Sequence, residues 1–334
     1  MHIKYVEFHI TNVCDISCNN CNKFNNFNLK GSFRWNDVSS IYERWASILT
    51  FDEITIVGGE PLTNPDLPNW IAGIRRLWPD ARLAVATNGV RLSKSPDAIR
   101  AMRENSVRLR LSIHAVNLHE KIMEDLDDLL IKPVKKNIEY LPHNMLAWKQ
   151  SYDSIKADSW QACDHPDDFA NLPAYIQKEC DGTFNFSKDK FDTYEAMTEL
   201  TDSTGFVVDI LWYTQFHEAA LTYEQGSFKL RNSDPEKAIN NCDQKFCHSF
   251  KDGKLYKCAV AHALPDAITQ FKIPISTEDQ QAIDEFAPAE IGWDISTLEG
   301  YVANLKDAAP ISMCRFCPEV YNTTPIGDVS KKRY

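Results

Sequence analysis

The sequence predicts an α/β fold in which strands and helices alternate around a parallel sheet. Short segments that alternate apolar and polar residues recur through the first 120 positions, and each is followed by a segment whose apolar residues repeat every three or four positions. The 334 residues, 43% of them hydrophobic, are enough for one large α/β domain with an appendage or for two ordinary domains. Periodicity leaves open whether the sheet is doubly wound or closed toward a barrel.

The first strand and helix come directly from their apolar patterns. Residues 4–11 place Val6, Phe8 and Ile10 on one face, which predicts a half-buried strand. Residues 35–49 place apolar side chains three and four apart, which predicts a helix. The first cysteines follow the strand at once.

The same pair of elements recurs along the next sixty residues. Strands are expected at 53–57, 82–86 and 107–114, and a helix with apolar positions from 67 to 77 follows the first of them. Ser95-Pro96 marks the start of another helix, since proline is favoured in the first helical turn. These repeats indicate βαβ units.

The later part of the chain has weaker patterns. Strands are expected at 136–141 and 206–212, and the long polar and aromatic stretch at 143–205 is interpreted as a lid or substrate wall. The run from Ser296 to Glu299 is a capping-box pattern that predicts a helix leading to Cys314.

Charge, hydropathy and cysteine usage restrict the class of protein. No apolar run is long enough for a membrane helix, and the first residues lack the order of a signal peptide, so we expect a cytoplasmic protein without membrane contact. The formal charge of −11 argues against nonspecific nucleic-acid binding. Ten cysteines in a reducing compartment favour metal binding over disulfides.

Cys14, Cys18 and Cys21 form a CxxxCxxC group after the first strand. Three thiolates on one loop can hold three irons of a [4Fe-4S] cluster and leave the fourth iron open for a ligand. The alternative is zinc, which requires a fourth ligand, and His9 is the nearest candidate.

A second group of cysteines lies in the last third of the chain. Cys258 follows a predicted hairpin around Asp252-Gly253, and the other members are Cys242, Cys247, Cys314 and Cys317. Four of the five could hold an iron-sulfur cluster or a closed zinc knuckle.

The strand, the CxxxCxxC group and Gly58-Gly59-Glu60-Pro61 together resemble the radical S-adenosylmethionine (radical SAM) superfamily. The resemblance covers residues 4–116 and implies an α/β fold with a partial (β/α)6 TIM-like barrel. It also implies that Cys14, Cys18 and Cys21 bind a [4Fe-4S] cluster and that S-adenosylmethionine is the second cofactor.

The same resemblance suggests which residues contact S-adenosylmethionine. It implies that Gly58, Gly59 and Glu60 hold the methionine ammonium, and that Asn88 and Ser112 contact the ribose or the methionine carboxylate. Asn20 stands where the family usually has an aromatic residue, so adenine stacking would fall to Phe24 or be absent.

The C-terminal cysteines resemble the Twitch and SPASM extensions of radical SAM enzymes, which carry auxiliary [4Fe-4S] clusters. The expected division is a barrel at 1–235 and an auxiliary-cluster extension at 236–334. The preferred ligands are Cys242, Cys258, Cys314 and Cys317, and Cys247 is the substitute.

The resemblance implies an enzyme that cleaves S-adenosylmethionine reductively and abstracts a hydrogen atom from its substrate. A flavodoxin or ferredoxin is the implied reductant, and Cys180 or Cys163 is a candidate hydrogen donor. A small-molecule substrate is favoured, because no leader-binding domain precedes the first strand. The alternatives are an enzyme that modifies peptides or proteins and a zinc-stabilised binding protein without redox activity.

Overall fold

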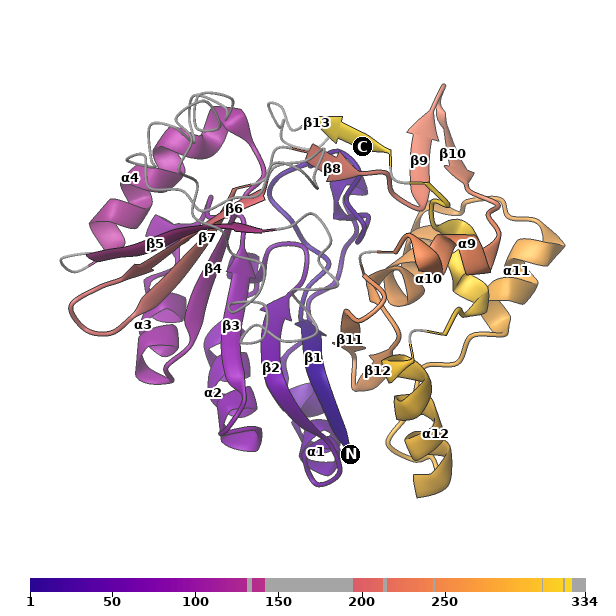
Figure 1. Ribbon diagram of the computed structural model, residues 1–334, viewed down its shortest axis with the longest axis horizontal. Coiled ribbons are helices and arrows are strands. Elements are labelled where there is room, and N and C mark those ends of the chain that lie inside the picture. Colours follow the sequence, from indigo (N-terminus) through magenta and orange to yellow (C-terminus); the bar gives the residue numbers. More distant parts are fainter. Residues whose placement is uncertain are drawn as a thin grey trace.

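A computed structural model describes residues 1–130, 134–141, 195–212, 215–242, 244–307, 309–320 and 322–325. Its main sheet has nine strands in the order β12-β11-β1-β2-β3-β4-β7-β6-β5. In Figure 1 the C-terminal helices gather beside the β11–β12 end of this sheet, and α3 and α4 lie toward the opposite end.

The centre of the sheet is parallel, which confirms the predicted α/β class and is consistent with a partial TIM-like barrel. β1 pairs with β2, β2 with β3, β3 with β4, and β4 with β7. These strands are β1 (His2–His9), β2 (Thr50–Val57), β3 (Arg82–Thr87), β4 (Arg108–Ile113) and β7 (Val207–Trp212). One helix follows each of the strands β1 to β4: α1 (Trp35–Ala46), α2 (Leu67–Leu77), α3 (Pro96–Glu104) and α4 (His119–Leu129).

Apolar side chains of the strands and helices form one large core. Val6 and Phe8 of β1 are in register with Ile54 and Ile56 of β2, and all four are fully buried. The apolar faces of α1 and α2 add Trp45, Trp70 and Ile74 to the same core. Burial of an aliphatic or aromatic side chain stabilises the fold by about 1.5–3 kcal/mol, so this packing fixes the strand ends that carry the site.

Beyond β4, the order of the strands in the sheet differs from their order in the sequence. β5 (Val134–Leu141) pairs antiparallel with β6 (Glu195–Thr201), which pairs antiparallel with β7. A tight turn at 202–206, with Gly205 at φ 84°, joins β6 to β7 and makes these two strands neighbours. The part of the expected lid that the structure describes, 195–205, is therefore strand β6 of the main sheet and most of the turn that follows it.

The C-terminal third continues the main sheet instead of beginning a separate one. β11 (His248–Lys251) pairs in parallel with β1 and antiparallel with β12 (Lys254–Tyr256). Asp252 and Gly253 both have positive φ, as in a two-residue hairpin turn, so the predicted hairpin is confirmed. The sheet thus extends past position 236, and the division there stays a prediction.

The other C-terminal elements surround this hairpin. Two small sheets are formed by β8 (Gln215–His217) with β13 (Thr323–Pro325) and by β9 (Leu221–Glu224) with β10 (Ser227–Leu230). The helices are α9 (Pro235–Asn240), α10 (Ala259–Phe271), α11 (Thr277–Asp284) and α12 (Ile295–Lys306).

The predicted cap of α12 is wrong by two residues. Asp294 is the N-cap, and its Oδ1 accepts the backbone N–H of Thr297 at 3.0 Å. Ser296 lies inside the helix and donates its hydroxyl to the same carboxylate. An aspartate can accept several of these unpaired donors at once, which explains why it takes the capping position.

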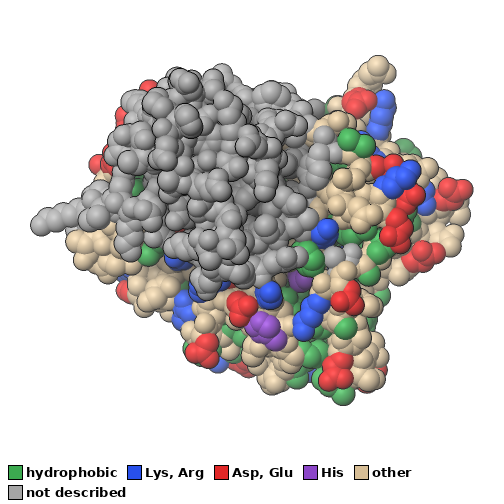
Figure 2. Space-filling model, viewed as in Figure 1, with side chains coloured by type: hydrophobic (Ala, Val, Ile, Leu, Met, Phe, Trp, Pro, Cys, Tyr) green, Lys and Arg blue, Asp and Glu red, His purple; other side chains and the backbone are tan. Residues whose placement is uncertain are grey.

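The described surface carries charges of both signs. In Figure 2, acidic and basic side chains are interspersed over the C-terminal part of the molecule. The exposed large hydrophobic residues are Tyr223, Ile295 and Val320. Within the described chain, every helix is too short or too polar to cross a lipid bilayer.

Candidate functional site

One cavity of about 360 Å³ is lined by cysteines from both groups. The N-terminal group contributes Cys14, Cys18 and Cys21, and the C-terminal group contributes Cys242, Cys258 and Cys317. The predicted cofactor residues Gly58, Gly59, Glu60, Asn88 and Ser112 line the same cavity. Segments more than 200 residues apart in sequence therefore meet at the carboxyl ends of the parallel strands, where barrel folds place their chemistry.

Gly58 and Gly59 are required by a close approach of two backbones. A Cβ on Gly58 would lie 2.5 Å from the carbonyl oxygen of Thr11, and one on Gly59 would lie 2.3 Å from that of Val13. The backbone N–H of Gly59 donates to Thr11 and that of Glu60 donates to Val13, at 2.7 and 2.8 Å. The glycines thus hold the turn after β2 against the segment that leads into Cys14.

The Glu60 carboxylate joins the ends of β2 and β3. Its Oε1 accepts the Leu62 backbone N–H at 2.9 Å and the Thr87 hydroxyl at 2.7 Å, and its Oε2 accepts the Asn88 backbone N–H at 2.8 Å. Burial raises the pKa of Glu60 to about 7, although these three hydrogen bonds oppose the shift. A cation bound beside this carboxylate would favour its charged form.

Two side chains at strand ends place a nitrogen atom near a sulfur atom of the CxxxCxxC loop. Asn88, after β3, donates from Nδ2 to Asp15 at 2.9 Å and to Cys14 Sγ at 3.9 Å. His114, after β4, places Nδ1 3.7 Å from Cys18 Sγ. Burial and the nearby Lys23 lower the pKa of His114 to about 4, so the ring is neutral near pH 7.

The residues of the CxxxCxxC loop fit a positively charged metal group. Burial, followed by the charge of Glu60, raises the pKa of the Cys14 thiol well above its usual range, and burial together with Cys21 and Cys14 does the same for Cys18. Thiolates become favourable there only if positive charge is bound among them. Oδ2 of Asp15 is also buried without a hydrogen-bond partner among the described residues.

The C-terminal cysteines converge around the start of α10. Cys258 is the residue before that helix, and burial and then Cys314 raise the pKa of its thiol to about 11. Cys314 packs against Ala238 and Ile239 with Cys242 and Cys317. The four preferred ligands are therefore neighbours. The described residues contain no group of three His, Cys, Asp or Glu side chains arranged to hold a single metal ion.

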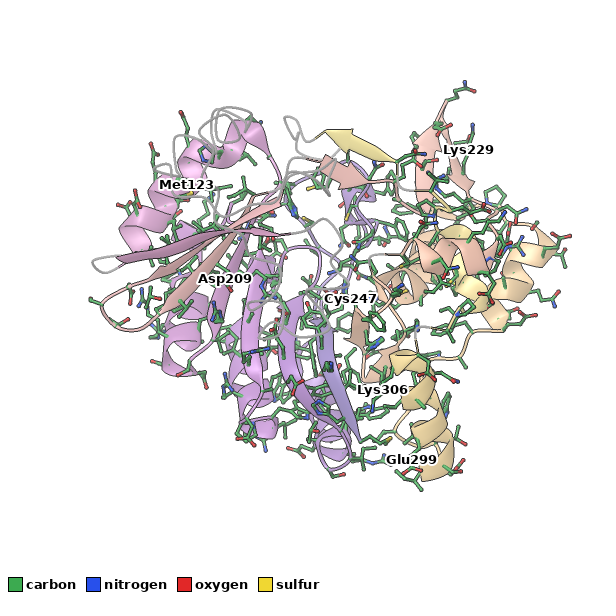
Figure 3. All side chains as sticks on the ribbon, viewed as in Figure 1. Met123, Asp209, Lys229, Cys247, Glu299 and Lys306 are labelled. Carbon is green, nitrogen blue, oxygen red and sulfur yellow. The ribbon has the colours of Figure 1, made fainter. Side chains whose placement is uncertain are left out.

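Cys247 has a different environment from the other four. Its Sγ donates to Glu7 Oε1 at 3.3 Å, and its side chain is buried. Figure 3 shows Cys247 near the centre of the molecule, between the parallel strands and the C-terminal helices. This contact favours Cys242 over Cys247 in the C-terminal group.

Several polar residues of the cavity were missed by sequence reasoning. Glu7 accepts the Tyr5 hydroxyl at 3.3 Å and pairs with Lys23 at 3.2 Å. Arg110 pairs with Glu53 at 3.0 Å and contacts the Thr55 hydroxyl. Tyr5, Glu7, Lys23 and Arg110 all line the cavity. Tyr5 and Glu7 of β1 and Arg110 of β4 are polar residues at alternating strand positions, and Lys23 follows the cysteine loop, so none of the four belongs to a recognisable motif.

Other sequence candidates are placed elsewhere or lie outside the described residues. Phe24 is fully buried in a second apolar cluster, which leaves it no exposed face for adenine stacking. His9 contacts Asn12 and the ring of His262. Cys163 and Cys180, the candidate hydrogen donors, fall outside the part of the chain that the structure describes.

Comparison with protein families assigns the N-terminal part of the chain. Residues 8–145 match the family model described as the Radical SAM superfamily. This segment is a radical SAM domain. It includes the CxxxCxxC loop, the turn after β2 and the ends of β3 and β4, so the expected family is confirmed for the part of the chain that carries them. Comparison with curated proteins returns no match.

Partial likenesses to solved structures accompany this family match. The crystal structure of BtrN with AdoMet and 2-DOIA aligns with 34% of this chain and 46% of its own at 20% identity and a TM-score of 0.28. The structure of Streptococcus suis SuiB with the precursor peptide SuiA aligns with 37% of this chain and 31% of its own, at 15% identity and a TM-score of 0.29. The structure of anSMEcpe with AdoMet and a peptide aligns with 38% of this chain and 39% of its own, at 13% identity and a TM-score of 0.29. The alignments span less than half of each of these chains.

The family match concerns the domain at residues 8–145 and the cofactors that its superfamily implies. The superfamily consists of enzymes, and it implies S-adenosylmethionine and a [4Fe-4S] cluster. The reaction type is left open by the match, since one superfamily hosts many chemistries.

Proposed function

We propose that this radical SAM protein cleaves S-adenosylmethionine reductively and uses the resulting radical to abstract a hydrogen atom from a substrate in the shared cavity. The observation that carries the proposal is the convergence of the CxxxCxxC loop, Glu60, Asn88 and Ser112 on one cavity. When bound, a [4Fe-4S] cluster supplies the electron that splits S-adenosylmethionine into methionine and a 5′-deoxyadenosyl radical.

The chain's own residues would bind and orient the cofactors. Cys14, Cys18 and Cys21 would hold the cluster, and the unshared acceptor capacity of Glu60 would receive the methionine ammonium. Ser112 would donate to the ribose or the carboxylate. Asn88 has a second role, because its amide already contacts Asp15 and Cys14.

An auxiliary [4Fe-4S] cluster at Cys242, Cys258, Cys314 and Cys317 is the second part of the proposal. Supporting it are the proximity of these four thiols and the cavity that three of them share with the first group. A cluster there would lie close enough to the substrate to exchange electrons with it or to bind it. Lys257, next to Cys258, would offset part of the negative charge of four thiolates.

A small polar molecule is the proposed substrate. The cavity presents Glu7, Lys23 and Arg110, so it offers both an acceptor and donors to a polar group. The cavity of about 360 Å³ would also have to hold S-adenosylmethionine, which leaves little space for a large substrate. A peptide substrate is the alternative. A flavodoxin or ferredoxin is the proposed source of the electron.

The decisive test is the formation of 5′-deoxyadenosine by anaerobically reconstituted protein supplied with a reduced flavodoxin. We expect product from the wild type and none from the Cys14→Ala/Cys18→Ala/Cys21→Ala variant. The matched control is Cys314→Ala/Cys317→Ala, which should still cleave S-adenosylmethionine. Undiminished product in the triple variant would contradict the proposal, and near-stoichiometric zinc without iron would favour a non-redox binding protein.

A further inference from the structure

His114 connects the end of β4 to the first cysteine loop. It follows Ile113, the last residue of the strand, and its Nδ1 lies 3.7 Å from Cys18 Sγ although the two residues are 96 positions apart. The ring meets Phe216 edge to face, with centroids 5.5 Å apart and planes at 79°. The strand end and this aromatic contact together fix the direction in which Nδ1 points.

We propose that His114 donates its Nδ1–H to the Cys18 thiolate when the cluster is bound and thereby raises the cluster's reduction potential. This inference rests on the proposed function, because it requires a cluster at Cys14, Cys18 and Cys21. His114 is a positioning residue in this role, since it acts on the cluster through the sulfur of Cys18.

The physical basis is the charge that the cluster gains on reduction. The cluster takes up one electron, no proton moves, and negative charge increases on the irons and their sulfur ligands. An N–H dipole aimed at a ligand sulfur stabilises the reduced form more than the oxidised form, so the potential rises. The effect is strong where water is excluded, because a low local dielectric strengthens the interaction.

The comparable contact at Cys14 is weaker. Asn88 Nδ2 lies 3.9 Å from Cys14 Sγ and donates at 2.9 Å to Asp15, so most of its donor capacity is directed at the carboxylate. His114 is consequently the stronger of these two sulfur contacts.

The test is a potentiometric titration of the reconstituted protein. It is monitored by electron paramagnetic resonance, through the cluster signal that changes when S-adenosylmethionine is added. His114→Leu removes the donor. At a fixed potential, we expect the ratio of reduced to oxidised cluster to fall about tenfold, which corresponds to a potential about 59 mV more negative for one electron. His114→Gln keeps an N–H donor and should recover part of the shift.

His2→Leu is the matched control, since His2 is a half-exposed histidine that bonds to Thr50 at the opposite end of β1. It should leave the potential unchanged. A potential in His114→Leu equal to that of the wild type, at equal iron and sulfide content, would overturn the inference and leave the proposed function standing. A wild type without any cluster at these cysteines would instead refute both.

A second measurement covers the case in which His114→Leu does not hold a cluster. Wild-type protein labelled with ¹⁵N-histidine should show hyperfine coupling between one histidine nitrogen and the reduced cluster. Its presence supports the hydrogen bond, and its absence overturns it whatever the variant does.

Discussion

Among single residues, Glu60 holds the ends of two strands together with one buried carboxylate. Glu60→Ala leaves the donors of Leu62, Thr87 and Asn88 without their acceptor in a buried environment. Each unsatisfied donor costs about 1–3 kcal/mol, so we expect the free energy of unfolding to fall by roughly 3 kcal/mol or more. Urea denaturation of cluster-free protein measures this. Glu43→Ala, at an exposed ion pair, should change stability by less than about 1 kcal/mol.

Glu60 also belongs to the proposed S-adenosylmethionine site. Glu60→Gln removes the negative charge and with it a charge-assisted hydrogen bond of about 1.5–3 kcal/mol to the ammonium. We therefore expect affinity for S-adenosylmethionine to fall roughly ten- to a hundredfold, measured by calorimetry on folded, cluster-loaded protein. Unchanged affinity would show that this carboxylate serves only to join the strands.

Local sequence motifs were enough to predict some of the residues that line the cavity. The cysteine loop, Gly58, Gly59, Asn88 and Ser112, which the resemblance assigns to cofactor binding, all line one cavity, and their binding roles stay predictions. Glu7 and Arg110 were not found, because a charged residue inside a strand has the same pattern whether it faces a cavity or a buried partner. No motif in the sequence marks His114, and only the fold brings Cys18 next to it.

Among the elements, the turn after β2 depends on the absence of a side chain at Gly59. Gly59→Ala places a Cβ 2.3 Å from the Val13 carbonyl oxygen, so either the turn or the cysteine loop must move. We expect a loss of about 1–3 kcal/mol, as for other overpacked sites, and reduced iron content in the loop. Gly300→Ala is the matched control, because space around Gly300 in α12 is open and alanine favours helices by about 0.5–1 kcal/mol. A Gly59→Ala protein as stable as the wild type would contradict this argument.

The elements themselves were more predictable than their neighbours in the sheet. β2, β3, β4 and α2 follow local patterns of period two and 3.6, and the structure confirms them near the expected bounds. Pairing of β4 with β7 and of β1 with β11 joins strands about 100 and 240 residues apart. Such contacts depend on packing of the whole sheet, which no local window of sequence contains.

For the molecule as a whole, the arrangement predicts two metal groups that can be removed separately. The two proposed [4Fe-4S] clusters sum to about eight irons per chain. Cys314→Ala/Cys317→Ala should lower the iron content to about half and reduce stability, because a metal held between α9 and α10 links these elements. Iron and sulfide analysis after anaerobic reconstitution measures the content. An unchanged iron count would contradict the assignment of these cysteines.

The junction between the parallel strands and the C-terminal helices contains two buried histidines. His9 of β1 and His262 of α10 are 1% and 3% exposed, and their ring centroids are 4.7 Å apart. Burial is the main reason that both pKa values lie well below 6.5, with the charge of Lys251 adding to the effect and His9 itself contributing at His262. Both rings are therefore neutral in the folded protein near pH 7.

This arrangement predicts that acid weakens the junction. Below about pH 6.5 the unfolded chain binds protons at these histidines that the folded chain does not. Their contribution to the free energy of unfolding therefore falls as pH falls, by up to about 1.4 kcal/mol per pH unit for each histidine. His262→Gln keeps a group that can reach Ser249 but does not titrate. Urea denaturation of cluster-free protein between pH 7 and 5 should show a shallower dependence of stability on pH for this variant than for the wild type. Identical slopes for wild type and His262→Gln would mean that the folded protein accommodates a charged ring at the junction.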